Sequence, residues 1–275
     1  MFSALILTLN EERNLPACLA SLVGCDDIVV LDSGSTDRTS AIAQAAGARV
    51  VVRPFTNFAD QRNFGHAHIA FKNQWVFHLD ADEQMTPALM RECSNLAAQN
   101  PGGIDGFMVA PRMHFHGRWI PHCTDFPAYQ ARFGHARRFH FIQVGHGQRE
   151  FPGMLLGKLQ ANYLHNLSVH SDADLEDKHR RYAHQEAAAF LIRPPGSKSL
   201  LLRLLSADAL IRRRALKELS QHLPARGLLR FFYQYIWRGG LLDGRAGLAY
   251  CILLSRYEHW IATEIRRQRR SPKLA

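Results

Sequence analysis

The sequence lacks the features that mark secreted, disulfide-bonded and membrane-spanning proteins. Its five cysteines are odd in number and none is spaced as Cys-x-x-Cys, so we expect reduced thiols and a cytoplasmic setting. Residues 1–9 contain no basic region and no small-residue cleavage site, which predicts no secretory signal. No apolar run reaches the roughly 18 residues of a transmembrane helix. Internal repeats and low-complexity segments are also absent from the sequence.

Charge is distributed unevenly along the 275 residues. Residues 1–177 contain 14 Lys/Arg and 18 Asp/Glu, a net charge of −4, whereas residues 178–275 contain 20 and 6, a net charge of +14. The boundary coincides with Arg193-Pro194-Pro195-Gly196, which is typical of a helix stop followed by a linker. No RNA- or DNA-binding motif accompanies the basic part, so nucleic acid is not the expected partner.

Apolar and aromatic side chains alternate with arginines in the basic part. This pattern occurs in residues 200–205, 211–216 and 228–238, and it is typical of helices that lie on a membrane surface. A solvated basic face on helices that pack against the rest of the chain is the alternative. Residues 191–275 are therefore predicted to form a basic, amphipathic helical tail that associates with membranes peripherally.

Short apolar runs in the first third alternate with helical patterns. Residues 4–9, 28–31, 48–52 and 75–79 are rich in Val, Ile and Leu and suit buried parallel strands. Asn14 is expected to cap the first intervening helix, with Pro16 in its first turn. Residues 35–37 are expected to open the second helix, with residues 41, 42, 45 and 46 facing inward. Such alternation predicts a right-handed α/β sheet.

Acidic residues follow two of the predicted strands. Asp32 ends the run 28–31, and Asp80 and Asp82 end the run 75–79. Open α/β sheets bind ligands outside the carboxyl ends of their strands, so these carboxylates are expected at one edge. Two carboxylates this close favour a cation between them, and oxygen ligands suit Mg²⁺ or Mn²⁺ held together with a diphosphate. A solvated acidic turn is the alternative for an isolated Asp-x-Asp.

Four segments in this order resemble the signature set of family 2 glycosyltransferases with the GT-A fold. They are Leu7–Glu11, Val30–Asp37, Gln61–Gly65 and Leu79–Glu83. The resemblance extends to Leu164-His165 and is closest to the branch of lipopolysaccharide inner-core β-glucosyltransferases. It implies an α/β fold, Rossmann-like, with a mostly parallel central sheet and flanking helices. The GT-A domain would cover residues 1–190, with a nucleotide-binding half at 1–105 and an acceptor half at 106–190.

The same resemblance implies roles for individual side chains. The nucleoside would be held by Thr8, Asn10, Glu11 and Asp32, with Asp32 accepting a hydrogen bond from the base, and Ser33 would also bind the nucleotide sugar. Asp80 would meet the ribose, Asp82 the metal, and Arg62 and Asn63 the diphosphate, for which a guanidinium is chemically apt. A solvated helix start is the alternative for Arg62, and an ordinary turn is the alternative for Asn10.

The acceptor half contains several histidines and no single obvious base. His165 or His170 is expected to complete the metal shell, and His146 with Arg132 is expected in the acceptor pocket. Relatives place an acidic residue directly after the histidine that matches His146, but here Glu150 comes later. Glu150 is therefore the first candidate for the base that deprotonates the acceptor, and Asp125 is the second.

The predicted function is metal-dependent, inverting transfer of a hexose from a nucleotide sugar, UDP-linked, to a lipid-anchored saccharide such as lipopolysaccharide core at the inner membrane. One alternative is a non-catalytic GT-A scaffold that binds membranes or polyanions, which the displaced Glu150 would favour and the Asp80/Asp82 pair opposes. A nucleotidyltransferase is the other alternative, although the expected glycine-rich, basic phosphate loop near the first strand is missing.

Overall fold

A computed structural model describes residues 1–145, 147–168, 172–191, 200–207, 212, 215, 216, 218, 219 and 225–270. The chain forms two compact units, residues 1–170 and 171–275. The predicted roles of His146 and His170 and the predicted linker at residues 193–196 fall outside the described residues. The functional boundary predicted near residue 190 stays a prediction.

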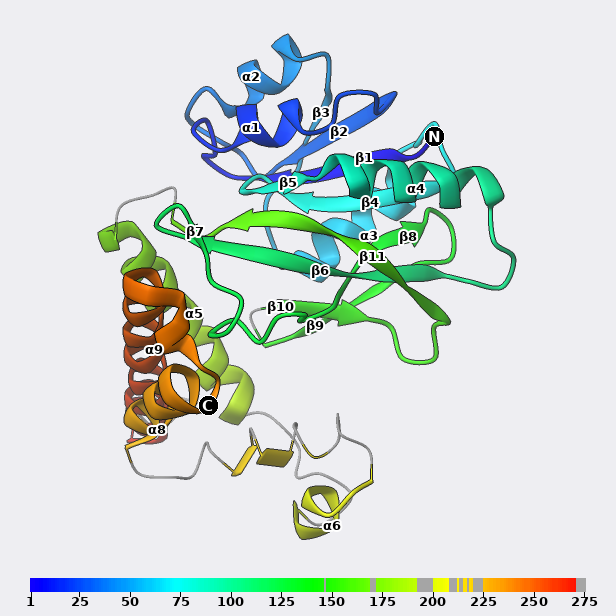
Figure 1. The fold of residues 1–275 in the computed structure, drawn as a ribbon. Coiled ribbons are helices and arrows are strands. Elements are labelled where there is room, and N and C mark those ends of the chain that lie inside the picture. The colour runs from blue at the N-terminus through cyan, green and yellow to red at the C-terminus, as the bar shows by residue number, and fades with distance from the viewer. Residues whose placement is uncertain are drawn as a thin grey trace. The chain divides into compact units, whose positions relative to one another are not determined.

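The described part of the first unit contains a nine-stranded mixed sheet (Figure 1). Its spatial order is β3-β2-β1-β4-β8-β6-β11-β5, with β7 paired to β6. The strands are β1 (Ser3–Thr8), β2 (Asp27–Asp32), β3 (Arg49–Val52), β4 (Trp75–Asp80), β5 (Glu83–Met85), β6 (Gly106–Phe115), β7 (Arg118–Trp119), β8 (Gln130–His135) and β11 (Leu156–Asn166). A separate hairpin joins β9 (Phe141–Val144) to β10 (Gly147–Glu150).

The first four strands of this sheet are parallel, as predicted from their apolar runs. Thr8 lies opposite Asp32 of β2, and Leu7 lies opposite Asp80 of β4. The carboxyl ends of β1, β2 and β4 therefore meet at one edge. Beyond β4 the sheet becomes mixed, because β8 runs antiparallel to both β4 and β6 while β11 runs parallel to β6.

Alternate side chains of β1 enter two separate cores. Ala4 and Ile6 pack in the cluster that includes helices α1 (Leu15–Ala20), α2 (Thr39–Ala45) and α4 (Pro87–Gln99). Leu5 and Leu7 pack on the other face, against helix α3 (Phe58–His68). Each fully buried Leu or Ile contributes roughly 1.5–3 kcal/mol, so both faces of the strand stabilise the fold.

Two local expectations about the first helices are wrong. Asn14 occupies the N-cap position of α1, but its side chain makes no capping bond and donates instead to Glu11, with a 2.6 Å Nδ2–Oε2 distance. Helix α2 begins only at Thr39, since Asp37 accepts bonds from the Thr39 amide and hydroxyl. The later start changes the buried side to Thr39 and Ala43, leaving residues 41, 45 and 46 exposed.

The second unit is helical in its described parts (Figure 1). It contains α5 (Asp172–Leu191), α6 (Leu200–Leu204), α8 (Arg226–Phe232), the π-helical turn η1 (Tyr233–Trp237), the 3₁₀ turn η2 (Gly240–Asp243) and α9 (Gly244–Arg270). Ala183 and Ala187 of α5 pack against Ile261 and Ile265 of α9. Among the described residues, no helix combines the length and apolarity needed to cross a membrane.

Candidate active site

The carboxyl end of β2 carries a carboxylate that organises two loops. Asp32 is 1% exposed and accepts four hydrogen bonds. Two come from the Thr8 and Ser35 hydroxyls, at 2.7 and 2.5 Å, and two from the amides of Gly34 and Ser35. A carboxylate has about four acceptor positions, so these contacts fill it. Asp32 thus holds the ends of β1 and β2 together, and its contact with a base stays a prediction.

The loop after β1 is fixed against the loop after β2. Asn10 has a left-handed backbone (φ 56°), its amide donates to the Ser35 hydroxyl at 2.8 Å, and its side-chain oxygen accepts from the Thr36 amide at 2.8 Å. The Glu11 amide donates to the Thr39 hydroxyl at 2.8 Å. Ser33 accepts from Gln61 of α3 at 3.2 Å. The residues predicted to hold a nucleoside therefore lie together in a rigid rim of this edge.

The acidic motif after β4 lies within a buried group of charges. Asp80 accepts from the Arg62 guanidinium at 2.6 Å and from the Arg132 guanidinium at 3.2 Å. Arg132 also donates to Glu83, with a 2.7 Å Nη2–Oε1 distance, and Glu83 accepts from the Asp80 amide at 2.8 Å. Arg62 and Glu83 are both fully buried. The solvated helix-start interpretation of Arg62 is therefore wrong.

Strand β11 brings a histidine to the same carboxylates. The Nε2 atom of His165 lies 3.5 Å from Oδ2 of Asp82, and its Nδ1 lies 3.6 Å from Oε1 of Glu83. The cause is the antiparallel pairing of β5 with β11, in which His165 lies opposite Glu83. The Asn166 amide also donates to the Asp82 carbonyl at 2.9 Å. Two residues predicted to share a metal are thus neighbours, although about 80 residues separate them in sequence.

Burial and charge shift the protonation equilibria of this group in opposite directions. Burial raises the pKa of Glu83, against the opposing charge of Arg132. Burial also acts on Asp80, but the charges of Arg62 and Arg132 outweigh it and hold its pKa well below the usual range. Burial lowers the pKa of Arg62 to about 10, so this side chain stays cationic near neutral pH. Asp80 and Arg62 therefore form an ion pair over the physiological range.

The donor atoms of the group suit an anion with a divalent cation. Nε and Nη1 of Arg62 and Nη1 of Arg132 are buried and have no hydrogen-bond partner among the described residues. Buried donors of this kind cost about 1–3 kcal/mol each, and phosphate oxygens are acceptors that satisfy them. In the described part of the chain, no group of three or more His, Cys, Asp and Glu side chains is arranged to hold a metal ion.

A two-residue metal site is nevertheless chemically reasonable. Mg²⁺ is commonly held by one or two protein groups, with substrate phosphates and water at the other positions. Adjacent ligands of an ion with bonds of roughly 2.1 Å lie about 3 Å apart. The 3.5 Å separation of Asp82 and His165 is close to this value. The residues present therefore fit a divalent cation that also binds a diphosphate.

The candidate bases lie on two different segments. Glu150 is the last residue of β10 and lies opposite Phe141 of β9. Asn63 of α3 holds that hairpin, because its side chain both donates to the Phe141 carbonyl and accepts from the Phe141 amide, each at 2.9 Å. Asp125 lies in the loop between β7 and β8 and has a left-handed backbone (φ 58°). The contact of Asn63 with a diphosphate stays a prediction.

Sequence reasoning missed three residues of the buried group. The motif Leu79–Glu83 contains Glu83 but indicates no role for it, and no motif in the sequence points to Gln130 or Tyr163. The side-chain oxygen Oε1 of Gln130 accepts from Arg132 and from the Tyr163 hydroxyl, both at 3.2 Å. The Arg132 guanidinium also lies 5.5 Å from the Tyr163 ring centroid. Only the position of Glu83 directly after Asp82 offered a signal in the sequence.

Comparisons with known proteins indicate the family of the chain. The family model described as glycosyl transferase family 2 matches residues 3–156. An uncharacterized glycosyltransferase of Rickettsia bellii is 38% identical over 100 residues, which cover 36% of this chain and 33% of that protein. The lipopolysaccharide core biosynthesis glycosyltransferase LpsC of Rhizobium meliloti is 38% identical over 120 residues, covering 42% and 43%. The matched regions thus span less than half the length of these relatives.

A solved structure shows the same fold along most of the chain. The mannosyltransferase PcManGT from Pyrobaculum calidifontis, in complex with GDP-Man and Mn²⁺, superposes with a TM-score of 0.50 and 14% identity, covering 97% of this chain and 87% of that one. The predicted GT-A architecture and the resemblance to lipopolysaccharide core enzymes are confirmed. Since the family model covers more than half of the sequence, the chain belongs to glycosyl transferase family 2.

Proposed function

We propose that the protein transfers a hexosyl group from a nucleoside-diphosphate sugar to a saccharide acceptor. The observation that carries this proposal is the convergence of Arg62, Asp80, Asp82, Arg132 and His165 at the carboxyl edge of the sheet in a family 2 chain. The guanidinium nitrogens of Arg62 and Arg132 that have no hydrogen-bond partner among the described residues suit the diphosphate, and the Asp82/His165 pair suits its cation.

Each part of the donor has proposed partners in the first unit. Thr8, Asn10, Glu11, Asp32 and Ser33 form the rim that would hold the nucleoside. In the same proposal Asp80 meets the ribose, and Arg62 and Asn63 meet the diphosphate. Because Asn10 and Asp32 are already fixed by hydrogen bonds, the rim needs little rearrangement before it receives a ligand.

Asp82 and His165 are the residues that would hold Mg²⁺ or Mn²⁺. When bound, the cation supplies charge stabilisation to the diphosphate that leaves the sugar. The protein groups around it have their own tasks. Arg62 and Arg132 keep Asp80 ionised and oriented, and both arginines are buried.

The transfer step needs a carboxylate on the acceptor side. We propose that Glu150 takes the proton of the acceptor hydroxyl while the hydroxyl oxygen attacks the anomeric carbon and the nucleoside diphosphate leaves. This direct displacement inverts the configuration at that carbon. The hairpin that carries Glu150 is held by Asn63, so the base has a defined position. Asp125 is the second candidate, and His146 and Arg132 are proposed to line the acceptor pocket.

The proposed acceptor is a lipid-anchored saccharide of the cell envelope, such as lipopolysaccharide core. LpsC, which this chain matches over 43% of its length, is described as a lipopolysaccharide core biosynthesis glycosyltransferase, and this supports the proposed acceptor class. The basic second unit would then hold the enzyme peripherally at the inner surface of a membrane. A UDP-linked hexose is the donor that we propose.

A donor screen tests the proposal directly. The purified chain is incubated with UDP-, GDP-, dTDP- and CDP-sugars and Mn²⁺ or Mg²⁺, and nucleoside diphosphate and sugar are quantified. We expect diphosphate release from one donor class, dependent on the cation and stopped by EDTA. NMR of the transferred sugar should show inverted anomeric configuration.

Three other outcomes would contradict all or part of the proposal. Tight nucleotide binding without turnover of any donor, even with extracted core saccharide as acceptor, would indicate the non-catalytic scaffold. Release of pyrophosphate from a nucleoside triphosphate and a sugar phosphate would indicate a nucleotidyltransferase. A retained anomeric configuration would remove Glu150 as a single base, because direct displacement inverts.

A further inference from the structure

The segment from α8 to η2 exposes an unusual number of large apolar side chains. We define the apolar face as the eight residues Leu228, Leu229, Phe232, Tyr233, Ile236, Trp237, Leu241 and Leu242, all of which are exposed. Trp237 is 83% exposed. Five of the eight recur at helical spacing, at positions 229, 232, 233, 236 and 237, so they share one side of the helix. Single exposed apolar residues are ordinary, but a contiguous group of this size marks an interaction surface.

The opposite side of the same segment is small and polar. Gly227, Gln234, Gly240 and Asp243 are buried, and so is Arg226, which forms an ion pair with Glu258 of α9. The usual arrangement of an amphipathic helix is therefore inverted, with polar groups inside and aromatic groups outside. A face that only completed the core of this unit would have the opposite pattern.

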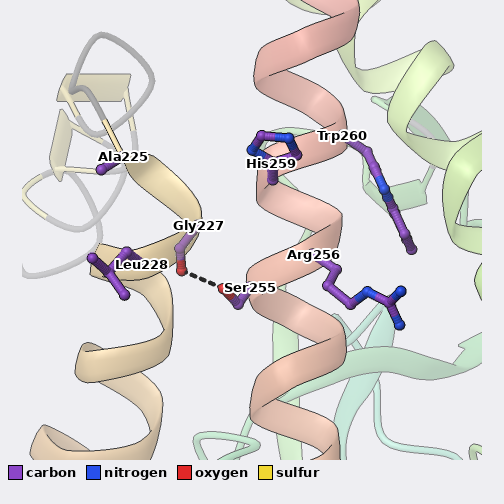
Figure 2. Close-up of a pocket in the computed structure, with 7 residues that line it drawn as sticks. All are labelled: Ala225, Gly227, Leu228, Ser255, Arg256, His259 and Trp260. Carbon is purple, nitrogen blue, oxygen red and sulfur yellow. Dashed lines mark hydrogen bonds between the residues drawn. The ribbon is translucent and has the colours of Figure 1, made fainter.

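Backbone contacts fix this inverted orientation. The Ser255 hydroxyl of α9 donates to the Gly227 carbonyl at 2.8 Å (Figure 2). A Cβ atom added to Gly227 would lie 2.5 Å from the Ser255 carbonyl oxygen, and one added to Gly247 would lie 2.4 Å from the Gly240 carbonyl oxygen. Glycine is thus required where the segment touches α9, and the large side chains have no room on that side.

A cavity of about 430 Å³ lies beside this contact between α8 and α9. Arg256, His259 and Trp260 line its α9 side (Figure 2). Of the apolar face, only Leu228 borders the cavity. The other seven residues of the apolar face do not line this cavity, so it is not the site that the exposed aromatic residues serve.

The charge of the segment indicates what it contacts. From α8 to the end of η2 the segment contains three arginines and one acidic residue, Asp243, which is buried. Two of them, Arg230 and Arg238, lie within the stretch that carries the exposed aromatic residues and are partly exposed. A second copy docked symmetrically on this face would bring Arg230 and Arg238 of both copies close together, which like charges disfavour. An anionic bilayer instead offers negative headgroups above an apolar layer, and Trp and Tyr side chains favour that boundary.

We propose that the apolar face is the surface by which the protein inserts into the headgroup region of an anionic lipid bilayer. Its aromatic and leucine side chains enter the boundary of the acyl chains, while Arg230 and Arg238 contact the headgroups. This inference rests on the proposed action at a membrane but assigns it to one surface. Its test measures lipid binding and not glycosyl transfer, so the two proposals fail separately.

The test compares two substitutions at equally exposed positions. Trp237→Glu places a charge on the apolar face, and Val23→Glu, at a residue that is also 83% exposed, places one on the first unit. Full-length variants are floated with vesicles of phosphatidylcholine alone or mixed with phosphatidylglycerol. We expect binding to the anionic vesicles only, weakened by about tenfold or more in Trp237→Glu and unchanged in Val23→Glu.

A second measurement uses the native side chain and needs no disruptive variant. Lipids brominated near the headgroup should quench the tryptophan fluorescence of the wild-type chain, and Trp237→Phe should bind equally but lose most of that quenching. The proposal is overturned if Trp237→Glu and Val23→Glu bind alike, if Trp237 is not quenched, or if no anionic vesicle binds. It is also overturned if wild type is a dimer that Trp237→Glu converts to a monomer, since the face would then join two copies.

Discussion

Replacing Arg132 with leucine should expose the balance of charges in the buried group. Arg132 is 5% exposed and its guanidinium donates to Glu83 at 2.7 Å and to Asp80 at 3.2 Å. Asp80 keeps Arg62 in the variant, but Glu83 loses the guanidinium that donates to it and keeps only His165, whose Nδ1 lies 3.6 Å away, as a nearby basic group in the described part of the chain. Removing one partner of a buried ion pair costs roughly 3–5 kcal/mol, which is the loss of unfolding free energy that we expect.

The loss should depend on pH, because Glu83 can take up a proton. Burial already raises the pKa of Glu83, and removal of Arg132 should raise it further. A carboxyl whose folded pKa lies above its unfolded value near 4.5 contributes stability that is full below pH 4.5 and lost as the pH rises through the folded value. Arg132→Leu should therefore be less destabilised, relative to wild type, at pH 5 than at pH 8.

Urea unfolding at both pH values measures this effect, with the double variant Arg132→Leu/Glu83→Leu as the matched control. The double variant should recover about 1–2 kcal/mol or more of the loss at pH 8, since neither charge then remains unpaired. A loss below about 1 kcal/mol in the single variant, or a double variant whose losses simply add, would refute the assignment of Arg132 and Glu83 as a buried pair.

Two further predictions concern the base and the acid stability of the first unit. Glu150→Gln should bind the donor with wild-type Kd, but its kcat for transfer should fall by about 100-fold or more, because a base acts in the transition state. If Asp125→Asn shows this behaviour instead, the two roles are exchanged. Burial lowers the pKa of His66 to about 4, and its Nε2 lies 3.0 Å from Nε2 of buried His78. The contribution of neutral His66 to the free energy of unfolding should therefore be full above pH 6.5 and fall as the pH drops toward 4, by up to about 3 kcal/mol. His66→Gln should flatten this part of the plot of unfolding free energy against pH, measured by urea unfolding. An unchanged slope in the variant would contradict the prediction.

The strands that build the nucleotide-binding edge could be predicted because local patterns determine them. The runs at residues 4–9, 28–31 and 75–79 lie within one or two residues of β1, β2 and β4, and their parallel pairing follows from the alternation with helices. Asp32 and Asp80 consequently lie where the motif positions indicated. Helix α2 was harder, since side-chain bonds of Asp37 delay its start and change its buried side.

The partners of the acidic motif could not be derived from local pattern. His165 meets Asp82 because β5 pairs with β11, and Arg132 meets Glu83 because β8 lies next to β4. These pairings join segments 49 or more residues apart, so no spacing in the sequence encodes them. The family resemblance named His165 and Arg132, but the buried roles of Glu83 and Tyr163 required the sheet register.

The inverted pattern of the second unit was also hidden from the sequence. Alternating arginines and aromatic residues at positions 228–238 indicated an amphipathic segment but not which side is buried. The close contacts of Gly227 with Ser255 of α9, and of Gly247 in α9 with Gly240 of η2, decide this, because they bring the backbones together and leave the large side chains outside. Such close contacts depend on where the helices cross, and a periodic pattern alone does not specify a crossing point.

The most direct test of the central claim is calorimetry of UDP binding with Mn²⁺ and with EDTA. Three proteins are compared: wild type, Asp82→Asn, and the control Asp26→Asn, which changes a carboxylate next to the amino end of β2, at the far end of the strands from the site. The account predicts that Mn²⁺ strengthens binding by about tenfold or more in wild type and in Asp26→Asn, and that Asp82→Asn loses this enhancement while keeping its fold by circular dichroism. Equal affinity with Mn²⁺ and with EDTA in wild type would contradict a metal-assisted nucleotide site at this edge.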